Sequence, residues 1–355
     1  MLFVTFLCLP RFSRPQYTTP DSMCALLVEK ARIRVFLGKT KMNLYSTRRD
    51  FLRTTAIASA AFLFPHPARG AKKKSVLLFT KSSGFEHAVI KVTDGKPSIV
   101  ENALRDMSAK YGFDLTASKD GRIFDSKEFH DYAAVVFFTT GVLTEEGTDK
   151  NPPMSPQGKQ AFLEAVHGGV GFVGIHAATD TFHTPPDPQD LSNRYIAHGE
   201  QSDPYIRMIG GEFIIHGQPK DPRLQTANVI IDDPKFPGLA GVHSPVSLME
   251  EWYSMKDFAP DLHVICTLDT STMNGNAYKR APYPVVWARM HGRGKVFYTA
   301  IGDRPENWQN TFHLNLLAGG IRWAIGDAKA SVPPNLKTAA PGYAEIPPKY
   351  PPSEK

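Results

Sequence analysis

From residue 75 onward, continuous apolar segments alternate with signals for the start of a helix. Residues 75–80 (SVLLFT), 133–139 (AAVVFFT) and 170–175 (VGFVGI) lack the polar–apolar alternation of a strand with one exposed face. Between them, Ser98 opens a capping box, and Ser155 stands as an N-cap before a proline. Strands buried on both faces and joined by helices predict right-handed crossovers and a doubly wound parallel sheet.

The second half of the chain carries more strand signals than helix signals. We expect strands at residues 228–231, 246–253, 263–268, 285–290 and 295–301, and a closing helix at residues 310–325. Because helix signals are scarce between these strands, some of them are expected to be antiparallel. No internal repeat is visible. We therefore predict one α/β domain over residues 71–330, with a mostly parallel sheet and added antiparallel strands, followed by a proline-rich tail at residues 331–355.

The N-terminal region has the pattern of an export signal. Arg48 and Arg49 precede an apolar run at residues 54–64, and small residues follow at Ala68 and Gly70. A charged region, a short apolar run and a small-residue cleavage site are typical of a secretory signal, and this run is too short to span a bilayer. The paired arginines predict twin-arginine translocation to the periplasm or the exterior. The alternative is a basic N-terminal segment with no targeting role.

We place this signal peptide at residues 42–70, and we interpret residues 1–41 as an over-extended start with Met42 as the initiator. Residues 1–70 carry 11 Lys and Arg against three Asp and Glu, whereas the remaining 285 residues carry 30 and 32. The body is therefore nearly neutral and lacks the basic surface that nucleic-acid binding requires. We predict no nucleic-acid partner and no membrane span in the mature protein.

Residues 168–180 (GGVGFVGIHAATD) place a histidine in a distinctive turn. Small residues stand two positions before and two positions after His176, at Gly174 and Ala178. This is the spacing of a nucleophile elbow, in which a tight strand-to-helix turn strains the central residue and needs small neighbours. Such a turn presents its central side chain at the carboxyl edge of the sheet, where α/β folds bind ligands. Because His176 stands in place of Cys or Ser, we do not expect amidotransferase, protease or esterase activity.

The order and spacing of the motifs resemble the ThuA-like (trehalose utilisation) family, which has a flavodoxin-like, class I glutamine amidotransferase-like fold. The resemblance covers about residues 76–326 and rests on TKSSGFEH (80–87), GGVGFVGIHAATD (168–180), MIGGEFIIH (208–216), EEWY (250–253), GRGKVFYTAIG (292–302) and IRWA (321–324). One residue departs from the family pattern, because Asp303 stands where we expect His. A carboxylate there can still accept a proton or bind a metal.

The resemblance implies that the protein acts on disaccharides or their keto-sugar derivatives, beside sugar oxidoreductases. An imidazole next to a carboxylate can move a proton beside a sugar carbonyl, because histidine titrates near working pH. We expect the catalytic residues to be His176, Asp180, Glu251 and His87. In this hypothesis His176 is the base or acid, and Asp180 or Glu251 orients it or takes the second proton.

Histidine and carboxylate side chains are also ligands of Zn²⁺ and Mn²⁺, so a bound divalent metal stays an open alternative. No HxH or HxxxH spacing marks a site, so ligands would come from distant segments; the candidates are His87, His176 and His216. His183 and His313 are expected to be ordinary hydrogen-bonding residues of the surface or of loops. No nucleotide-binding motif is present, and no other cofactor is indicated.

A second class of function stays open beside the enzyme. The protein would then be a non-catalytic carbohydrate-binding protein, or the partner of a sugar oxidoreductase. Separately from this choice, the structural alternative for Glu250 and Glu251 is a solvated strand end.

Overall fold

The chain is described here by a computed structural model, which covers residues 73–185, 192–218 and 222–350. The strands are β1 (Ser75–Phe79), β2 (Asp114–Ser118), β3 (Tyr132–Phe137), β4 (Gly171–Ile175), β5 (Glu212–Ile215), β6 (Gln225–Ile231), β7 (Val246–Glu250), β8 (Ser254–Lys256), β9 (His263–Asp269), β10 (Tyr283–His291) and β11 (Gly294–Thr299). The helices are α2 (Ile99–Tyr111), α3 (Pro156–Gly168), α4 (Pro204–Ile209), α5 (Thr311–Ala324) and α6 (Leu336–Ala339). The predicted start, signal peptide and cleavage site lie outside the described residues.

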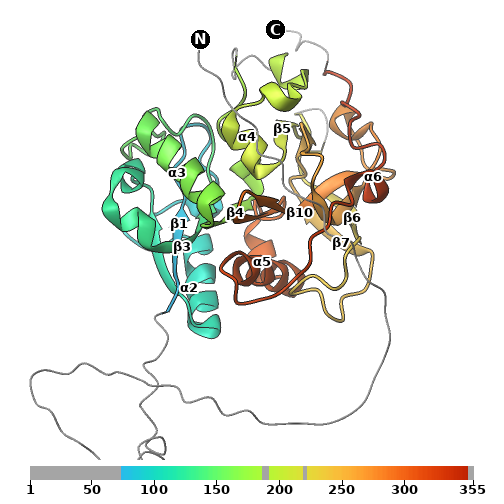
Figure 1. The fold of residues 1–355 in the computed structure, drawn as a ribbon. Coiled ribbons are helices and arrows are strands. Elements are labelled where there is room, and N and C mark those ends of the chain that lie inside the picture. The colour runs from blue at the N-terminus through green and yellow to red at the C-terminus, as the bar shows by residue number, and fades with distance from the viewer. Residues whose placement is uncertain (1–72, 186–191, 219–221, 351–355) are drawn as a thin grey trace, which may run out of the picture. The chain divides into compact units, whose positions relative to one another are not determined.

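Nine strands form one mixed sheet in the order β2-β1-β3-β4-β11-β10-β9-β6-β7 (Figure 1). The pairings from β2 to β11 are parallel. Those from β11 to β7 are antiparallel. β5 and β8 pair in a separate two-stranded sheet. This arrangement confirms the predicted α/β fold with added antiparallel strands.

Helices cover both faces of the large sheet, with α2 and α5 on one face and α3 and α4 on the other (Figure 1). On the α3 face, Phe162 stacks on Phe137 of β3 with ring centroids 4.9 Å apart. On the α5 face, Phe236 stacks on Phe297 of β11 at 5.6 Å and contacts Trp323 at 6.0 Å. The central strands are apolar on both faces because both faces pack against helices and loops.

The predicted helix starts are confirmed by their caps. The Ser98 hydroxyl accepts a hydrogen bond from the backbone N–H of Glu101 at 3.2 Å, and α2 begins at Ile99, directly after Ser98. The Ser155 hydroxyl does the same for the N–H of Gly158 at 2.8 Å, with Pro156 as the first residue of α3. Each cap satisfies an N–H that has no partner within its helix.

The predicted strand over residues 246–253 is wrong in its second half. β7 ends at Glu250, and the chain turns away to reach β8. The cause is the buried carboxylate of Glu250, which accepts hydrogen bonds from the N–H of Gly302 and the side-chain amide of Asn307, both at 2.8 Å. The residues after Glu250 therefore cross between the two sheets instead of extending one.

The proline-rich tail packs against the domain as far as it is described. The Asn335 side chain bonds to both backbone groups of Val264 in β9, at 2.6 and 3.0 Å. Further along, the carbonyl of Tyr343 accepts a hydrogen bond from Arg280 at 2.9 Å. Within the described ranges, no helix has the length and apolar character needed to cross a membrane.

His313 in α5 does not have the ordinary role expected of it. It is fully buried, and neither ring nitrogen has a hydrogen-bond partner. Its nearest aromatic neighbour is Trp308, with ring centroids 4.9 Å apart. Burial, reinforced by the positive charge of His176, lowers the pKa of His313 to about 3.

We expect His313→Leu to raise the free energy of unfolding by about 1–3 kcal/mol, because it removes a buried polar group that has no partner. Below its ordinary pKa of 6.5, His313 takes up a proton in the unfolded chain but stays neutral in the fold. The wild type therefore loses stability as the pH falls from 6.5 towards 3, and the variant loses less. Urea denaturation between pH 7 and pH 4 measures both effects. His243→Leu at an exposed position is the control, and an unchanged pH slope in His313→Leu would contradict the prediction.

Candidate active site

The turn after β4 places His176 under backbone strain. His176 has a φ of 44°, in the left-handed region, and begins the 3-10 turn His176–Asp180. A Cβ at Gly174 would lie 2.9 Å from Ile209 and 3.0 Å from Tyr298, so a side chain there would displace both neighbours. The tight turn predicted from the glycine and alanine spacing is present. It leads into this single 3-10 turn, however, and not into an α-helix.

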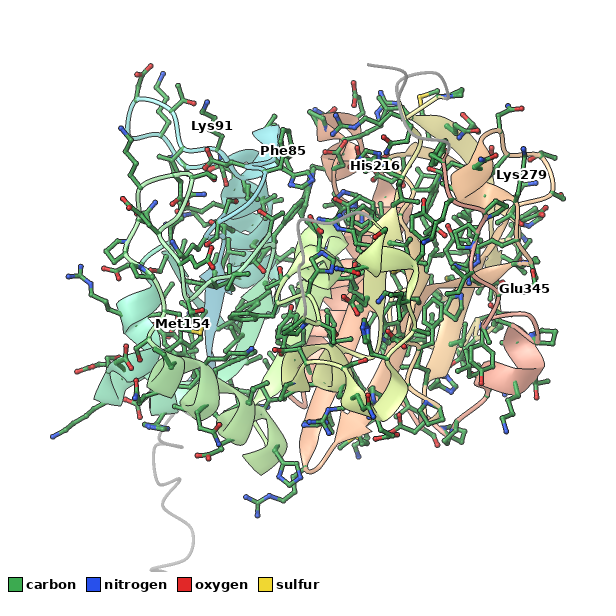
Figure 2. All side chains as sticks on the ribbon, turned by 90° about the horizontal axis from the view of Figure 1, so that it is seen from above. Phe85, Lys91, Met154, His216, Lys279 and Glu345 are labelled. Atoms are coloured by element: carbon green, nitrogen blue, oxygen red, sulfur yellow. The ribbon has the colours of Figure 1, made fainter. Side chains whose placement is uncertain are left out.

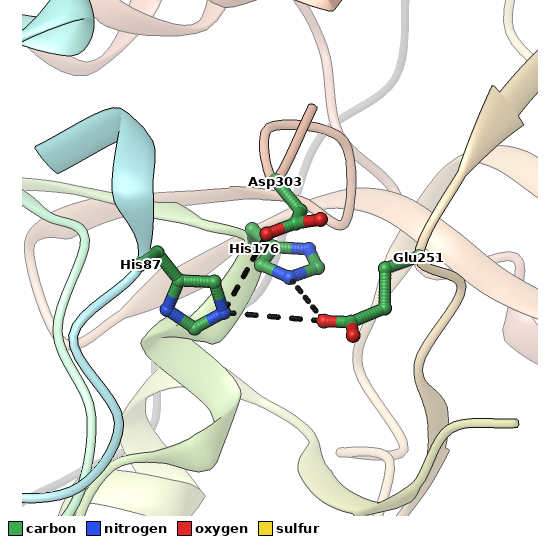
Figure 3. Close-up of side chains that lie close together, drawn as sticks. All are labelled: His87, His176, Glu251 and Asp303. Carbon is green, nitrogen blue, oxygen red and sulfur yellow. Dashed lines mark hydrogen bonds and ion pairs between the residues drawn. The ribbon is translucent and has the colours of Figure 1, made fainter. Parts of the chain in front are cut away.

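Four side chains from four separate segments converge beside this turn (Figure 3). The imidazole Nε2 of His176 lies 3.3 Å from Oε2 of Glu251. The Nε2 of His87 lies 3.9 Å from the same oxygen and 4.0 Å from Oδ1 of Asp303. All four donor atoms lie within 4.8 Å of one another. We call His87, His176, Glu251 and Asp303 the four-residue cluster.

His176 is held from both sides of its ring. Its Nδ1–H donates to the carbonyl oxygen of Ala300 at 2.8 Å, which directs Nε2 towards Glu251. Burial alone would lower the pKa of His176, but the hydrogen bond to Glu251 and the charges of Glu250 and Glu251 outweigh it and raise the pKa to about 9. His176 is therefore an imidazolium at neutral pH in the metal-free protein.

The carboxylate of Glu251 is the electrostatic centre of the cluster. Its Oε1 accepts a hydrogen bond from Nε of Arg223 and lies 3.7 Å from Nε2 of His216. Burial by itself would raise the pKa of Glu251, but the hydrogen bond and charge of His176, followed by His216 and Arg223, lower it to about 2. Glu250 and Glu251 are both buried, so the alternative of a solvated strand end is wrong for both residues.

His87 differs from His176 in charge. Burial, reinforced by the charge of His176, lowers the pKa of His87 to about 3, so its imidazole is neutral. Its Nε2 lies 3.3 Å from the hydroxyl of Tyr253, and its Nδ1 has no hydrogen-bond partner. A neutral imidazole carries a lone pair on one ring nitrogen, and at Nε2, which faces Glu251 and Asp303, that lone pair can accept a proton or bind a metal.

A cavity of about 240 Å³ opens beside the cluster. Its walls carry the aromatic rings of Phe85, Phe213 and Tyr253. Phe85 and His216, which both line it, lie near each other at the same edge of the domain (Figure 2). The residues with ionisable side chains that line it are His87, Asp180, Arg194, His216, Arg223 and Glu251.

Three of the four predicted catalytic residues, His87, Asp180 and Glu251, thus line one cavity. His176 does not line it, because it is fully buried behind Glu251 and packs on Tyr253 with ring centroids 4.2 Å apart. The turn therefore fixes the His176 ring in contact with the Glu251 carboxylate, but it gives the ring no direct contact with a ligand in the cavity.

Asp180 is fixed by a second histidine. Its Oδ1 accepts a hydrogen bond from Nε2 of His183 at 2.6 Å, and Nδ1 of His183 donates to Glu212 at 2.9 Å. Burial would raise the pKa of Asp180, but the hydrogen bond and charge of His183 lower it. His183 is a hydrogen-bonding histidine of a loop, as expected, but it is buried and joins two carboxylates beside the cavity.

Arg223, Phe85 and Phe213 were not among the residues selected from the sequence. Arg223 precedes β6 and reaches Glu251 from outside the quoted motifs. Phe85 belongs to the TKSSGFEH motif and is 60% exposed at the cavity rim, which is unusual for a large apolar side chain. A single exposed aromatic in a glycine loop gives no sequence signal, since most aromatic residues belong to the core.

These features define a flavodoxin-like α/β protein whose strained turn after β4 holds a buried histidine. A family model described as trehalose utilisation (ThuA) matches residues 75–324, and the chain therefore belongs to the ThuA family.

The solved structures that are similar to this chain include two ThuA-like proteins. A ThuA-like protein of Bacteroides uniformis is 18% identical with a TM-score of 0.52, covering 76% of this chain and 98% of its own. A ThuA-like protein of Parabacteroides merdae is 20% identical with a TM-score of 0.48, covering 77% and 98%. None of the curated proteins matches this chain. The first structure supports the same fold.

Proposed function

We propose that the protein is an exported enzyme that acts on a disaccharide in its keto-sugar form and moves a proton beside the sugar carbonyl. One observation carries this proposal: imidazole and carboxylate groups from separate segments face one cavity with aromatic walls. At about 240 Å³ the cavity is smaller than the ~300–1,000 Å³ of pockets for drug-sized ligands, and it suits a single sugar ring. Aromatic rings are suitable surfaces for the apolar face of a sugar.

The proposed step is removal of a proton from the carbon next to the ketone. The C–H bonding electrons form a C=C bond while the carbonyl oxygen takes the negative charge. Return of a proton to the former carbonyl carbon, with transfer of the proton of the adjacent hydroxyl to the enolate oxygen, completes an isomerisation. Departure of the glycosidic oxygen with a proton completes an elimination. We assign the base to Asp180, because it is ionised, lines the cavity and is oriented by His183. His216, a half-buried imidazole on the same wall, is placed to return the proton.

In this proposal His176 is a positioning residue, because it does not line the cavity. It holds the Glu251 carboxylate from behind and supplies positive charge near the carbonyl end of the substrate. The sequence hypothesis gave the proton transfer to His176. We assign it instead to Asp180 and His216, which line the cavity.

Export is also part of the proposal. Twin-arginine translocation of residues 42–70 would deliver the protein folded to the periplasm or the exterior. A ketone on the sugar ring must be made by oxidation of an alcohol, so a sugar oxidoreductase is the class of enzyme that supplies the substrate. Such an oxidoreductase is the proposed partner.

Deuterium exchange tests the proposed proton transfer. We expect the full chain in D2O to replace the protons beside the ketone of a 3-keto-disaccharide, seen as loss of their proton NMR signals. Asp180→Asn should slow this exchange by about 10²–10⁴-fold, the usual contribution of a general base. Asp114→Asn, at a side chain that is 63% exposed, is the matched control and should exchange like the wild type.

The outcomes separate the two classes of function. Broadened sugar signals without exchange would indicate the non-catalytic carbohydrate-binding protein. Wild-type exchange rates in Asp180→Asn would overturn the assigned base, and neither exchange nor broadening would overturn the sugar class.

A further inference from the structure

We propose that the four-residue cluster binds one divalent transition-metal ion, Zn²⁺ or Mn²⁺, through Nε2 of His87 and His176 and one carboxylate oxygen each of Glu251 and Asp303. This inference deepens the proposed function, because the ion would lie at the cavity wall where the substrate carbonyl is expected. Two imidazoles and two carboxylates are a donor set that suits these ions and not Ca²⁺ or Cu⁺.

The spacing of the donor atoms fits such an ion. Ligand distances of about 2.1 Å around a tetrahedral ion place neighbouring donors about 3.4 Å apart. In the cluster the separation is 3.3 Å between His176 and Glu251, 3.9 Å between His87 and Glu251, and 4.0 Å between His87 and Asp303. Small rotations of the side chains bring these donors onto one ion. Figure 3 shows the four side chains directed at a common point.

The surroundings orient two of the four donors, His176 and Glu251, as in metal sites. A metal-binding histidine usually donates its other N–H to a carbonyl or carboxylate, and His176 does so with Ala300 at 2.8 Å. The oxygen of Glu251 that faces away from the cluster accepts a hydrogen bond from Arg223. The strained turn fixes the backbone of His176, so this imidazole is held in place before an ion arrives.

The charge of the site also favours a cation. Two of the proposed ligands are carboxylates, Glu251 and Asp303, and Arg223 is the guanidinium in contact with Glu251. A dication bound between these two carboxylates compensates negative charge that one guanidinium leaves.

A second group of possible metal ligands already surrounds a positively charged side chain of the protein itself. His198, Glu212 and Asp257 also lie within 4.8 Å of one another. The ammonium of Lys256 lies among them, 3.1 Å from Glu212 and 3.4 Å from Asp257. That site already holds its cation, whereas among the described residues no ammonium or guanidinium lies within ion-pair distance of Asp303.

The ion would give the proposed reaction its electrophile. His87 and Glu251 line the cavity, and the Asp303 side chain is 18% exposed, so a substrate oxygen has access to this position. A divalent ion there polarises the ketone and stabilises the negative charge that develops on its oxygen. Asp180 keeps its role as base.

Isothermal titration calorimetry of the full chain, stripped with a chelator and titrated with Zn²⁺, tests the site. We expect one Zn²⁺ per chain and a higher melting temperature with the ion bound. Asp303→Asn should weaken Zn²⁺ binding by at least about 10-fold, since even partners of ligands contribute that much. Asp303→His should restore binding, because an imidazole nitrogen can replace the carboxylate oxygen. His216→Gln tests a nearby histidine as an alternative ligand, and His243→Gln at an exposed position is the control that should bind Zn²⁺ like the wild type.

No Zn²⁺ or Mn²⁺ binding by folded wild type, or equal binding by Asp303→Asn, would overturn the inference. A larger loss in His216→Gln than in Asp303→Asn would also overturn this ligand set. If chelator-treated protein still catalyses deuterium exchange, the proposed function holds and does not require a metal. Zn²⁺ binding through the cluster without exchange would leave the site standing and overturn the function.

Discussion

Glu251→Gln is expected to reduce deuterium exchange into a 3-keto-disaccharide by about 10²–10³-fold, the loss typical of removing one preorganised charge from an active site. Glu251 is the residue that joins His176, Arg223 and His216 at the cavity wall. The substitution keeps the shape of the side chain but removes its charge. His176 and Arg223 then lose the carboxylate that orients them, and the metal site loses one ligand.

A matched control separates this effect from a general effect of removing a carboxylate. Glu128→Gln changes an exposed glutamate and should exchange at the wild-type rate. Urea denaturation of Glu251→Gln verifies that the assayed protein is folded. Exchange within about twofold of wild type in folded Glu251→Gln would show that the cluster takes no part in the reaction.

The second large effect concerns stability. Lys256→Met is expected to lower the free energy of unfolding by about 3–5 kcal/mol, because it removes the buried ammonium that compensates the charges of Glu212 and Asp257. The Lys256 side chain is fully buried between Glu212 and Asp257, and its ammonium donates to the carbonyl of Ile196 at 2.6 Å. This ammonium, together with the Asp257 carboxylate that accepts hydrogen bonds from the N–H groups of His198 and Gly199, holds the end of β8 against the loop that carries Ile196.

Urea denaturation measures the loss, and Lys337→Met at an exposed lysine is the control. The double variant Lys256→Met with Glu212→Gln should lose less than the two single changes added together, because the second change removes an uncompensated charge. A loss below about 1 kcal/mol in Lys256→Met would mean that the buried charges are not coupled as we describe.

The fold could be predicted where a local pattern decided the structure. The apolar runs at β1, β3 and β4 are strands because helices or loops cover both of their faces, and such burial leaves a continuous apolar sequence. β2 has no such run, because its residues alternate between exposed and half-buried positions. The break after β7 could not be predicted, since it depends on hydrogen bonds from Gly302 and Asn307, which are distant in sequence.

The candidate site could be predicted in part for the same reason. The small residues around His176 indicated the turn, because the crowded turn has no space for larger side chains at the neighbouring positions. The contact of Arg223 with Glu251 and the link from His183 to Glu212 join segments about 30 residues apart, and no spacing rule connects them. Asp303 was noticed as a departure from a family pattern, and the structure adds that it lies 4.0 Å from His87.

The most direct test of the account is proton NMR of the wild-type full chain in D2O with a 3-keto-disaccharide, and with trehalose as the matched sugar that lacks the ketone. The account predicts enzyme-dependent loss of the proton signals beside the ketone, and no exchange into trehalose. Exchange no faster than in buffer alone for the 3-keto-disaccharide would contradict the claim that this cavity moves a proton next to a sugar carbonyl.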